Sequence, residues 1–281
     1  MKEKMKMVLM MMCACLIFSA VPAAAEEAAQ DPVSGDVSLS ALSAYIWRGQ
    51  ELSRHSVVLQ PSATVSYKGF SANIWGNLDT KPYSRESENY AGNYTETDVT
   101  LSYARQFGIV NTEVGYIYYA LASLAPGGTD PLDTQEVYIS VGLDTLLAPT
   151  LKVYKDIDHY HQWYATLGIS HTFEFHERVS LDLAAQVSYL KSEDEGAYPK
   201  FDANALATAD KYNNFHDGMV SASLPISITD KISITPTIAY VFPLVDDAKY
   251  EMQGRGLKGS LMPTDNDSAF LYGGVVMSFS F

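Results

Sequence analysis

Residues 179–189 read Val-Ser-Leu-Asp-Leu-Ala-Ala-Gln-Val-Ser-Tyr, with an apolar side chain at every odd position and polar or small side chains between them. This is the period of a β-strand, whose successive side chains point to opposite faces of a sheet. The same alternation recurs at residues 59–67, 135–144 and 269–281. The chain is therefore predicted to consist of strands that each have one apolar and one polar face.

The pattern predicts about twelve strands, with boundaries uncertain by about two to four residues. They lie at residues 37–48, 57–67, 70–79, 96–105, 109–121, 134–144, 149–156, 163–173, 179–190, 216–226, 232–242 and 268–281. Connections after the even-numbered strands are short, as at Lys68-Gly69. Most of the others are long, at residues 80–95, 122–133, 191–215 and 243–267.

Long loops that alternate with short turns along the chain lie at one end of an up-and-down sheet. Outer-membrane barrels have this asymmetry, with short periplasmic turns and long extracellular loops. The alternative, a secreted β-sandwich, has no reason to keep its long loops at one end. We therefore predict an all-β fold: a transmembrane antiparallel up-and-down β-barrel of about twelve strands, an estimate from the strand pattern alone.

The N-terminus has the pattern of an export signal. Three lysines precede an unbroken apolar run over residues 7–18, and the stretch ends in three alanines at residues 23–25. This arrangement predicts a signal peptide over residues 1–25, cleaved near Ala25. Residues 26–36 are then a short periplasmic segment, residues 37–281 form the barrel, and the outer membrane of a Gram-negative cell is the expected location. Both cysteines lie in the leader, so no disulfide is expected in the mature chain.

The formal net charge of the 281 residues is -14. This balance excludes a general nucleic-acid binder, which needs clustered positive charge to neutralise phosphates. Aromatic residues fall into two groups, one near the short turns and one near the long loops. Two such belts mark the two interfaces of a membrane. Outer-membrane lipid is therefore one expected partner.

Two short motifs resemble known proteins. Ser278-Phe279-Ser280-Phe281 resembles the C-terminal strand of bacterial outer-membrane proteins, which implies recognition of Phe281 by the barrel-assembly machinery. Residues 43–49, Ser-Ala-Tyr-Ile-Trp-Arg-Gly, together with Gln60-Pro61, residues 67–70 and residues 74–76, resemble the opening hairpins of the TorF-type porin family. That second resemblance implies a porin and says little about its solute.

Candidate site residues follow from turning the polar face of each strand inward, because lipid cannot solvate charge. Near the outer mouth this places Arg48, Asp79, Glu96, Asp98, Glu136 and Asp217. Deeper in the lumen it places Asn73, Asn77, Glu113, Lys152 and Asp182. The carboxylates predict a vestibule that attracts cations. A compatible alternative is structural, with Arg48 held by neighbouring carboxylates to brace the wall.

Chemistry beyond permeation has less support in the sequence. A lipid hydrolase needs a histidine beside a serine nucleophile, and no serine here has a distinctive local motif. His159 and His161 lie on a predicted outer loop, and Asp246-Asp247 and residues 265–267 supply oxygen ligands without the fixed spacing of a calcium loop. We predict no enzyme activity and no cofactor, and leave metal binding at these loops open.

The leading hypothesis is a porin-like channel that passes small hydrophilic solutes with weak cation preference. The alternatives are an outer-membrane lipid-modifying enzyme and a plugged barrel whose loops bind a partner.

Overall fold

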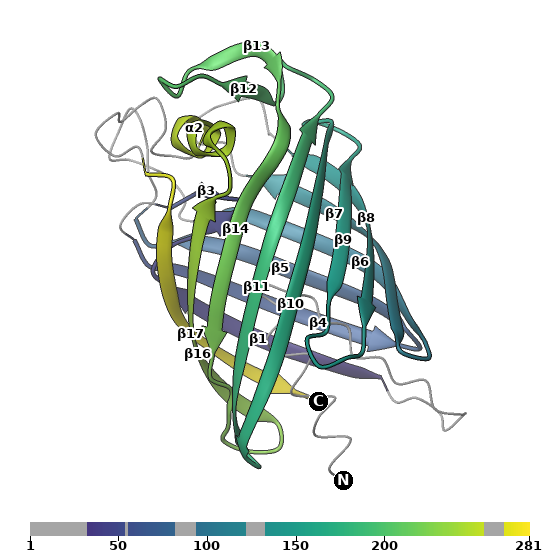
Figure 1. Ribbon diagram of the computed structural model, residues 1–281. Helices are drawn as coiled ribbons and strands as arrows, with labels where there is room; N and C mark the ends of the chain where they lie inside the picture. The colour runs from purple at the N-terminus through teal and green to yellow at the C-terminus, as the bar shows by residue number, and fades with distance from the viewer. Residues whose placement is uncertain (1–32, 54–55, 82–93, 122–132, 256–266) are drawn as a thin grey trace.

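The computed structural model describes residues 33–53, 56–81, 94–121, 133–255 and 267–281 (Figure 1). The predicted signal peptide lies outside these ranges, as do residues 26–32 of the predicted periplasmic segment. Among the described residues, no helix is long and apolar enough to cross a membrane.

Twelve long antiparallel strands form a closed barrel, which confirms the predicted fold class. They are β1 (Ser34–Leu42), β4 (Val58–Tyr67), β5 (Phe70–Asp79), β6 (Tyr94–Phe107), β7 (Val110–Leu121), β8 (Thr134–Leu143), β9 (Thr150–Asp156), β10 (Gln162–His176), β11 (Val179–Ser192), β14 (Asn213–Ser223), β16 (Ile232–Pro243) and β17 (Phe270–Ser280). Each pairs with its neighbour along the chain, and β1 closes the ring by pairing with β17. The two-residue β15 (Ile226–Ser227) continues the line of β14 between β11 and β16.

The predicted boundaries agree with these strands to within three residues, except at the first strand. β1 begins at Ser34 and ends at Leu42, so the predicted strand over residues 37–48 is too long. Residues 46 and 47 belong instead to a separate short strand, β2 (Ile46–Trp47), which pairs with β3 (Gln50–Glu51).

The two faces of the barrel differ as the alternation predicted. Large apolar side chains point outward and are exposed on strand after strand, for example at Val65, Leu101, Ile139, Leu167 and Leu271. The inward positions between them hold polar side chains, many of them buried. An apolar surface that encircles a protein has no stable partner in water. A hydrocarbon layer is the environment that this exterior fits.

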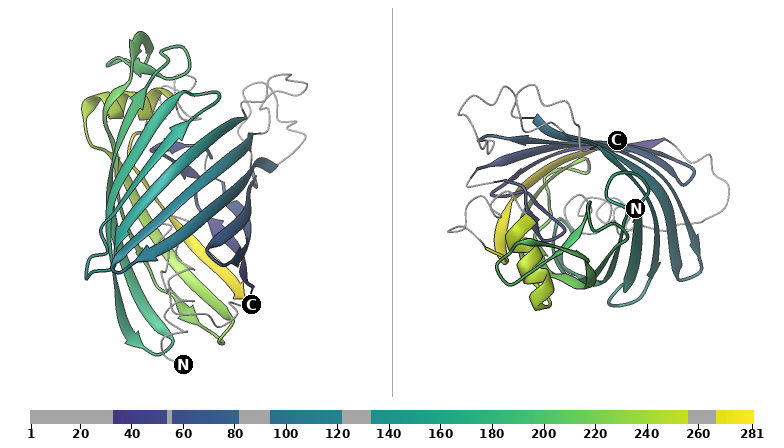
Figure 2. Two further views of the ribbon diagram at one scale, coloured as in Figure 1. Left: turned by 90° about the vertical axis from the view of Figure 1, so that its right-hand side faces the viewer. Right: turned by 90° about the horizontal axis from the view of Figure 1, so that it is seen from above.

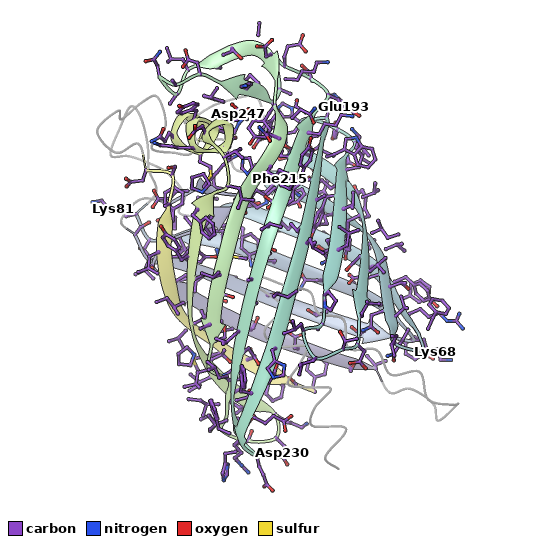
Figure 3. All side chains as sticks on the ribbon, in the orientation of Figure 1. Lys68, Lys81, Glu193, Phe215, Asp230 and Asp247 are labelled. Carbon is purple, nitrogen blue, oxygen red and sulfur yellow. The ribbon has the colours of Figure 1, made fainter. Side chains whose placement is uncertain are left out.

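Short and long connections lie at opposite ends of the barrel. In Figure 3, Lys68 and Asp230 mark the end with the short turns, and Glu193 and Asp247 mark the other end. The Lys68-Gly69 turn has positive φ at both residues, 51° and 84°, which is the geometry of a two-residue hairpin turn that favours glycine. We call the end with the long connections the outer mouth.

Two connections at the outer mouth have secondary structure that the sequence pattern did not predict. A hairpin of β12 (Pro199–Phe201) and β13 (Ala207–Lys211) follows β11, and helix α2 (Asp246–Arg255) follows β16. Viewed from above, both lie over one side of the barrel (Figure 2). Asp246-Asp247 was predicted to lie in a loop. It opens α2 instead, because acidic side chains in the first turn are favoured by the helix dipole.

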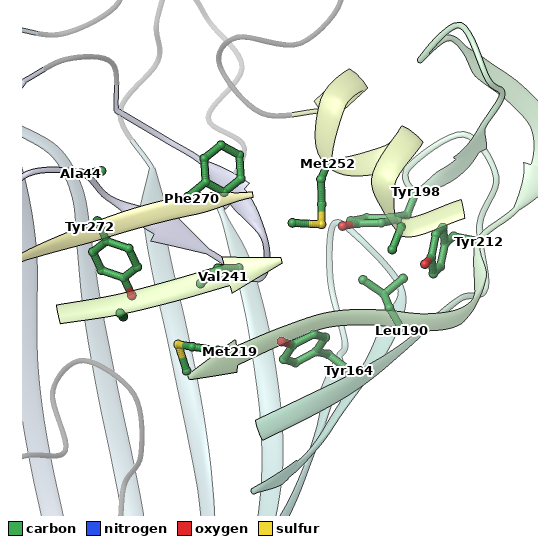
Figure 4. Packing of buried hydrophobic residues seen from close by; sticks show 12 residues of the cluster. Ala44, Tyr164, Leu190, Tyr198, Tyr212, Met219, Val241, Met252, Phe270 and Tyr272 are labelled. Carbon is green, nitrogen blue, oxygen red and sulfur yellow. The ribbon is translucent and has the colours of Figure 1, made fainter. Parts of the chain in front are cut away.

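The apolar core lies inside the barrel at the outer mouth (Figure 4). It joins Met252 of α2 to Leu190 of β11 and Met219 of β14, together with Tyr198 and Tyr212 of the connection between those strands. Ala44, which follows β1, belongs to the same cluster. This packing attaches α2 and the chain after β1 to the inner wall.

Candidate functional site

An inner hairpin, defined here as residues 43–53, narrows the outer mouth. Arg48 and Gly49 form its turn with φ of 47° and 76°, so both residues are left-handed, as a tight two-residue turn requires. Met252 packs against this turn, and a Cβ on Gly49 would lie only 3.0 Å from the Met252 methyl carbon. The Arg-Gly pair therefore reverses the chain inside the lumen, where the sequence pattern predicted that the barrel strand would continue to residue 48.

Arg48 is fixed at the tip of the inner hairpin by one carboxylate. Its two terminal nitrogens each donate to a different oxygen of Glu136, both at 2.7 Å, and this bidentate geometry is the strongest that arginine forms with a carboxylate. The guanidinium also lies 4.6 Å from the ring centroid of Trp47, 5.1 Å from that of Tyr154 and 4.4 Å from that of Tyr164. Burial alone would lower the pKa of Arg48, but the charge of Glu136 raises it, so the guanidinium stays ionised.

Further contacts tie the inner hairpin to several parts of the barrel. The Tyr45 hydroxyl donates to Glu96 of β6 at 2.9 Å. Trp47 packs edge-on against Tyr119 of β7, with ring centroids 6.3 Å apart. The Gln50 amide donates to the Tyr198 hydroxyl at 2.7 Å. The inner hairpin is thus a fixed constriction held from three sides.

A second buried charge cluster holds α2 against the wall. His216 of β14 is fully buried, and its two ring nitrogens lie 2.9 Å from Asp217 and 2.7 Å from Glu251 of α2. Ser188 donates to the same Asp217 oxygen at 2.7 Å. Burial alone would raise the pKa of Glu251, but the charge and hydrogen bond of His216, together with Arg255, lower it.

This cluster does not form a hydrolytic triad. Each ring nitrogen of His216 contacts a carboxylate, so neither is free to accept a proton from a serine hydroxyl. Its role is to attach the helix to the barrel.

A cavity of about 260 Å³ lies beside the inner hairpin within the lumen. Its wall contains Trp47 and Arg48 from the hairpin, Lys152 and Tyr154 from β9, and Gln186 from β11. The lining thus combines aromatic rings with a few polar groups, which is typical of sites for small solutes.

Four of the six mouth residues predicted from the sequence take part in two of these contact groups. Arg48 meets Glu136 directly, and Tyr45 links Glu96 to the same hairpin. Asp98 lies two residues beyond Glu96 on the same face of β6, level with Tyr119 across the sheet. Asp217 belongs to the His216 cluster instead.

The remaining predicted residues are spread along the lumen wall. Asp79 accepts a hydrogen bond from the backbone of Lys81 at the end of β5. Asn77 and Asn73, on the same strand, bridge to β4 through Gln60 and Ser62. Glu113 accepts a hydrogen bond from Tyr138, Asp182 accepts one from Thr172 at 2.7 Å, and Lys152 faces the cavity.

Sequence reasoning missed Tyr45, Tyr119, Tyr164, His216 and Glu251. The histidine follows the long connection after β11, and Glu251 lies in what was predicted to be a loop. Residues 246–255 begin with two acids and end with a basic residue. This charge pattern suits a helix dipole and could have revealed the helix.

The predicted loop histidines lie in a tight turn between β9 and β10. Asp156 accepts backbone hydrogen bonds from residues 158, 160 and 161 there, and both His159 and His161 are exposed. Within the described ranges, no group of three or more His, Cys, Asp or Glu residues has an arrangement that could hold a metal ion. Asp265 and Asn266 lie outside those ranges.

Comparison with known proteins gives a match to the fold but not to a family. No family model and no curated protein sequence matches the chain, so the TorF-type resemblance is not confirmed. Among solved structures, the NanC porin has a TM-score of 0.51 and 14% identity, over 87% of this chain and 98% of that one. At that identity the likeness shows a shared outer-membrane barrel fold.

Two further structures are similar at lower scores. An outer-membrane channel from Pseudomonas putida F1 has a TM-score of 0.42 and 11% identity, over 93% of this chain and 97% of that one. A loop-deletion mutant of OmpT, an outer membrane protein of Vibrio cholerae, has a TM-score of 0.39 and 8% identity, over 89% of this chain and 98% of that one.

Proposed function

We propose that this protein is a porin-like channel in the outer membrane, through which small hydrophilic solutes diffuse passively. The observation that carries the proposal is a closed barrel with an apolar exterior, a polar interior and a cavity of about 260 Å³ beside a fixed constriction. A barrel that only anchored loops could fill its interior with apolar side chains. The inward positions here carry polar side chains instead, such as Ser38, Gln60, Ser140 and Thr166, and Thr166 lines the cavity.

We further propose a weak preference for cations at the outer mouth. Residues 191–217 carry six acids, Glu193, Asp194, Glu195, Asp202, Asp210 and Asp217, against Lys191, Lys200 and Lys211. Because the field of exposed charges decays over about 8 Å at physiological salt, this net negative region should concentrate cations only close to the entrance. The preference is weak because two buried mouth carboxylates, Glu136 and Asp217, each face a basic partner.

A liposome swelling assay tests the channel proposal. Liposomes that contain the folded protein should swell in isotonic solutions of small sugars at rates that fall steeply with solute size, because the inner hairpin narrows the path. Swelling no faster than protein-free liposomes for every solute, with folding confirmed by heat-modifiable migration, would contradict it. Release of fatty acid from labelled lipid by the same sample would instead support the lipid-modifying alternative.

A plugged barrel that binds a partner through its outer connections is the second candidate. The inner hairpin favours it, because Arg48, Tyr45 and Gln50 attach that segment to three parts of the molecule at once. Deletion of the hairpin separates the two functions. A channel should pass larger solutes after the deletion, whereas a plugged barrel should conduct only after it.

A further inference from the structure

Lys152 is a buried cation without a carboxylate partner. The residue is 7% exposed, and its ammonium lies 5.1 Å from the ring centroid of Tyr138 and 5.9 Å from that of Tyr154. Within the part of the chain that the structure describes, no ion pair or hydrogen bond joins Lys152 to another residue. Burying a charge without a partner is costly, so this ammonium requires an anion or water in the cavity that it faces.

The other charges of the cavity wall are compensated within the protein. Arg48 uses both terminal nitrogens for Glu136. Asp217 accepts hydrogen bonds from Ser188 and from the Tyr164 hydroxyl, and also contacts His216. The cavity therefore presents one uncompensated positive charge to a solute.

Glu113 is the carboxylate that most weakens the attraction of Lys152 for an anion. It lies in the same row of the sheet as Lys152, two strands away through Ser140. The Tyr138 hydroxyl donates to one of its oxygens, and no ion pair joins it to Lys152. The negative charge of Glu113 should reduce the affinity of Lys152 for an anion without abolishing it. This repulsion should be stronger for an anion with two charges than for one with a single charge.

The rest of the cavity suits the body of a small hydroxylated molecule. Trp47, Tyr154 and Tyr164 line the cavity around Arg48 and supply apolar ring atoms, while Gln186 and Thr166 supply an amide and a hydroxyl. A volume of about 260 Å³ is far more than the roughly 10–15 Å³ that one water needs. The cavity therefore has room for a small organic molecule.

We propose that the cavity binds a small hydroxylated monocarboxylate, with its carboxylate on Lys152. This inference rests on the proposed channel function and names the class of solute that the channel retains. A neutral polyol of the same size would leave the ammonium unpaired, and an inorganic anion would leave the aromatic wall in contact with water. The acidic outer mouth and the basic cavity then act at different depths, one on small ions and one on the organic solute.

The test compares block of the channel current by gluconate and by sorbitol, two six-carbon hydroxylated molecules that differ in the carboxylate. Current through the reconstituted protein in KCl should be blocked by gluconate at a concentration at least about tenfold lower than by sorbitol, a ratio that corresponds to about 1.4 kcal/mol. Lys152→Gln should remove this difference, Lys152→Arg should keep it within a few-fold, and Glu113→Gln should enlarge it.

Lys155→Gln is the matched control. Lys155 lies on the same strand, and its ammonium faces Trp163 and pairs with Glu193 outside the cavity. Block by gluconate should be unchanged in this variant.

The remaining outcomes separate the inference from the function on which it rests. Conductance with equal block by gluconate and sorbitol in the native protein would overturn the carboxylate site while leaving the channel intact, and this comparison requires no variant. Unchanged gluconate block in a folded Lys152→Gln variant would also overturn it. If the protein does not conduct, calorimetric titration of gluconate into the protein in detergent still tests binding, and absence of heat there would overturn the site as well.

Discussion

The bond between Arg48 and Glu136 should hold the inner hairpin in the lumen, and Glu136→Gln should release it. Both partners are nearly inaccessible, with side-chain exposures of 6% and 1%. Breaking a buried pair by removing one charge costs about 3–5 kcal/mol. Glutamine keeps the shape of glutamate and can still accept one hydrogen bond, so the lower end of this range, about 3 kcal/mol, is expected.

Hydrogen exchange at the hairpin amides measures this loss directly. The Leu52 amide donates to the Tyr45 carbonyl at 2.8 Å across the hairpin, so it exchanges only when the hairpin opens. A loss of about 3 kcal/mol should speed its exchange by about 10²-fold, because each 1.4 kcal/mol is a factor of ten. Amides in the barrel strands should keep their protection.

Glu193→Gln serves as the control for this experiment. Glu193 pairs with Lys155, but its side chain is 46% exposed, and exposed pairs contribute about 0–1 kcal/mol. Exchange at Leu52 should not change in this variant. If Glu136→Gln also leaves Leu52 exchange unchanged in a folded barrel, the pair does not hold the hairpin and the reasoning is wrong.

Three further predictions follow from the same contacts. Val187→Arg should impair barrel assembly far more than Gln186→Arg, since Val187 is an exposed outward residue and Gln186 lines the cavity. An outward cation near the midplane costs about 2–4 kcal/mol. Equal yields of the heat-modifiable form would refute the assigned faces. The pKa of Glu251 is lowered in the folded protein, so its contribution to holding α2 is complete above its ordinary pKa and is lost as the pH falls through the lowered value. The methyl NMR signal of buried Met252 should therefore stay constant from pH 7 to about 4.5 and broaden or shift below it. A change already at pH 6 would exclude Glu251 as the group responsible. Glu96→Gln combined with Asp98→Asn should move the reversal potential in a KCl gradient toward zero from the cation-selective side, and an unchanged value would place these carboxylates away from the ion path.

The barrel could be predicted from the sequence because each strand is long enough to show its own alternation. The wall of a membrane barrel requires an apolar side chain at every second position, so the pattern over residues 179–189 directly records which face meets lipid. The lengths of the connections then predicted which end of the barrel holds the short turns and which holds the long loops. None of these signals depends on contacts between distant residues.

The inner hairpin could not be separated from the first strand in the same way. Residues 43–47 keep apolar and aromatic side chains that suit a barrel strand, and these same side chains pack inside the lumen, as Tyr45 does against Trp75 at 5.6 Å. The turn residues Arg48 and Gly49 were visible, but nothing local indicates that they reverse inward. That direction is set by Glu136, which lies 88 residues away.

The candidate site was predictable in its composition and not in its pairing. Eleven polar residues were predicted to face the lumen, yet only the fold decides that Arg48 is neutralised by Glu136 while Lys152 is not. The difference matters for function, because a compensated arginine braces the wall and an uncompensated lysine can hold a solute. Helix α2 contributed Glu251 to the site from a segment that had no strand pattern to guide its prediction.

The central claim is that the polar lumen is a path for solutes. Single-channel recording in planar lipid bilayers is the most direct test of it. Purified, folded protein in KCl should insert in discrete current steps of uniform size. The Glu136→Gln variant should show a larger or noisier open level, because its inner hairpin is less firmly held. Bilayers that remain silent after insertion of folded native protein would contradict the claim, even if the hairpin-deleted variant conducts.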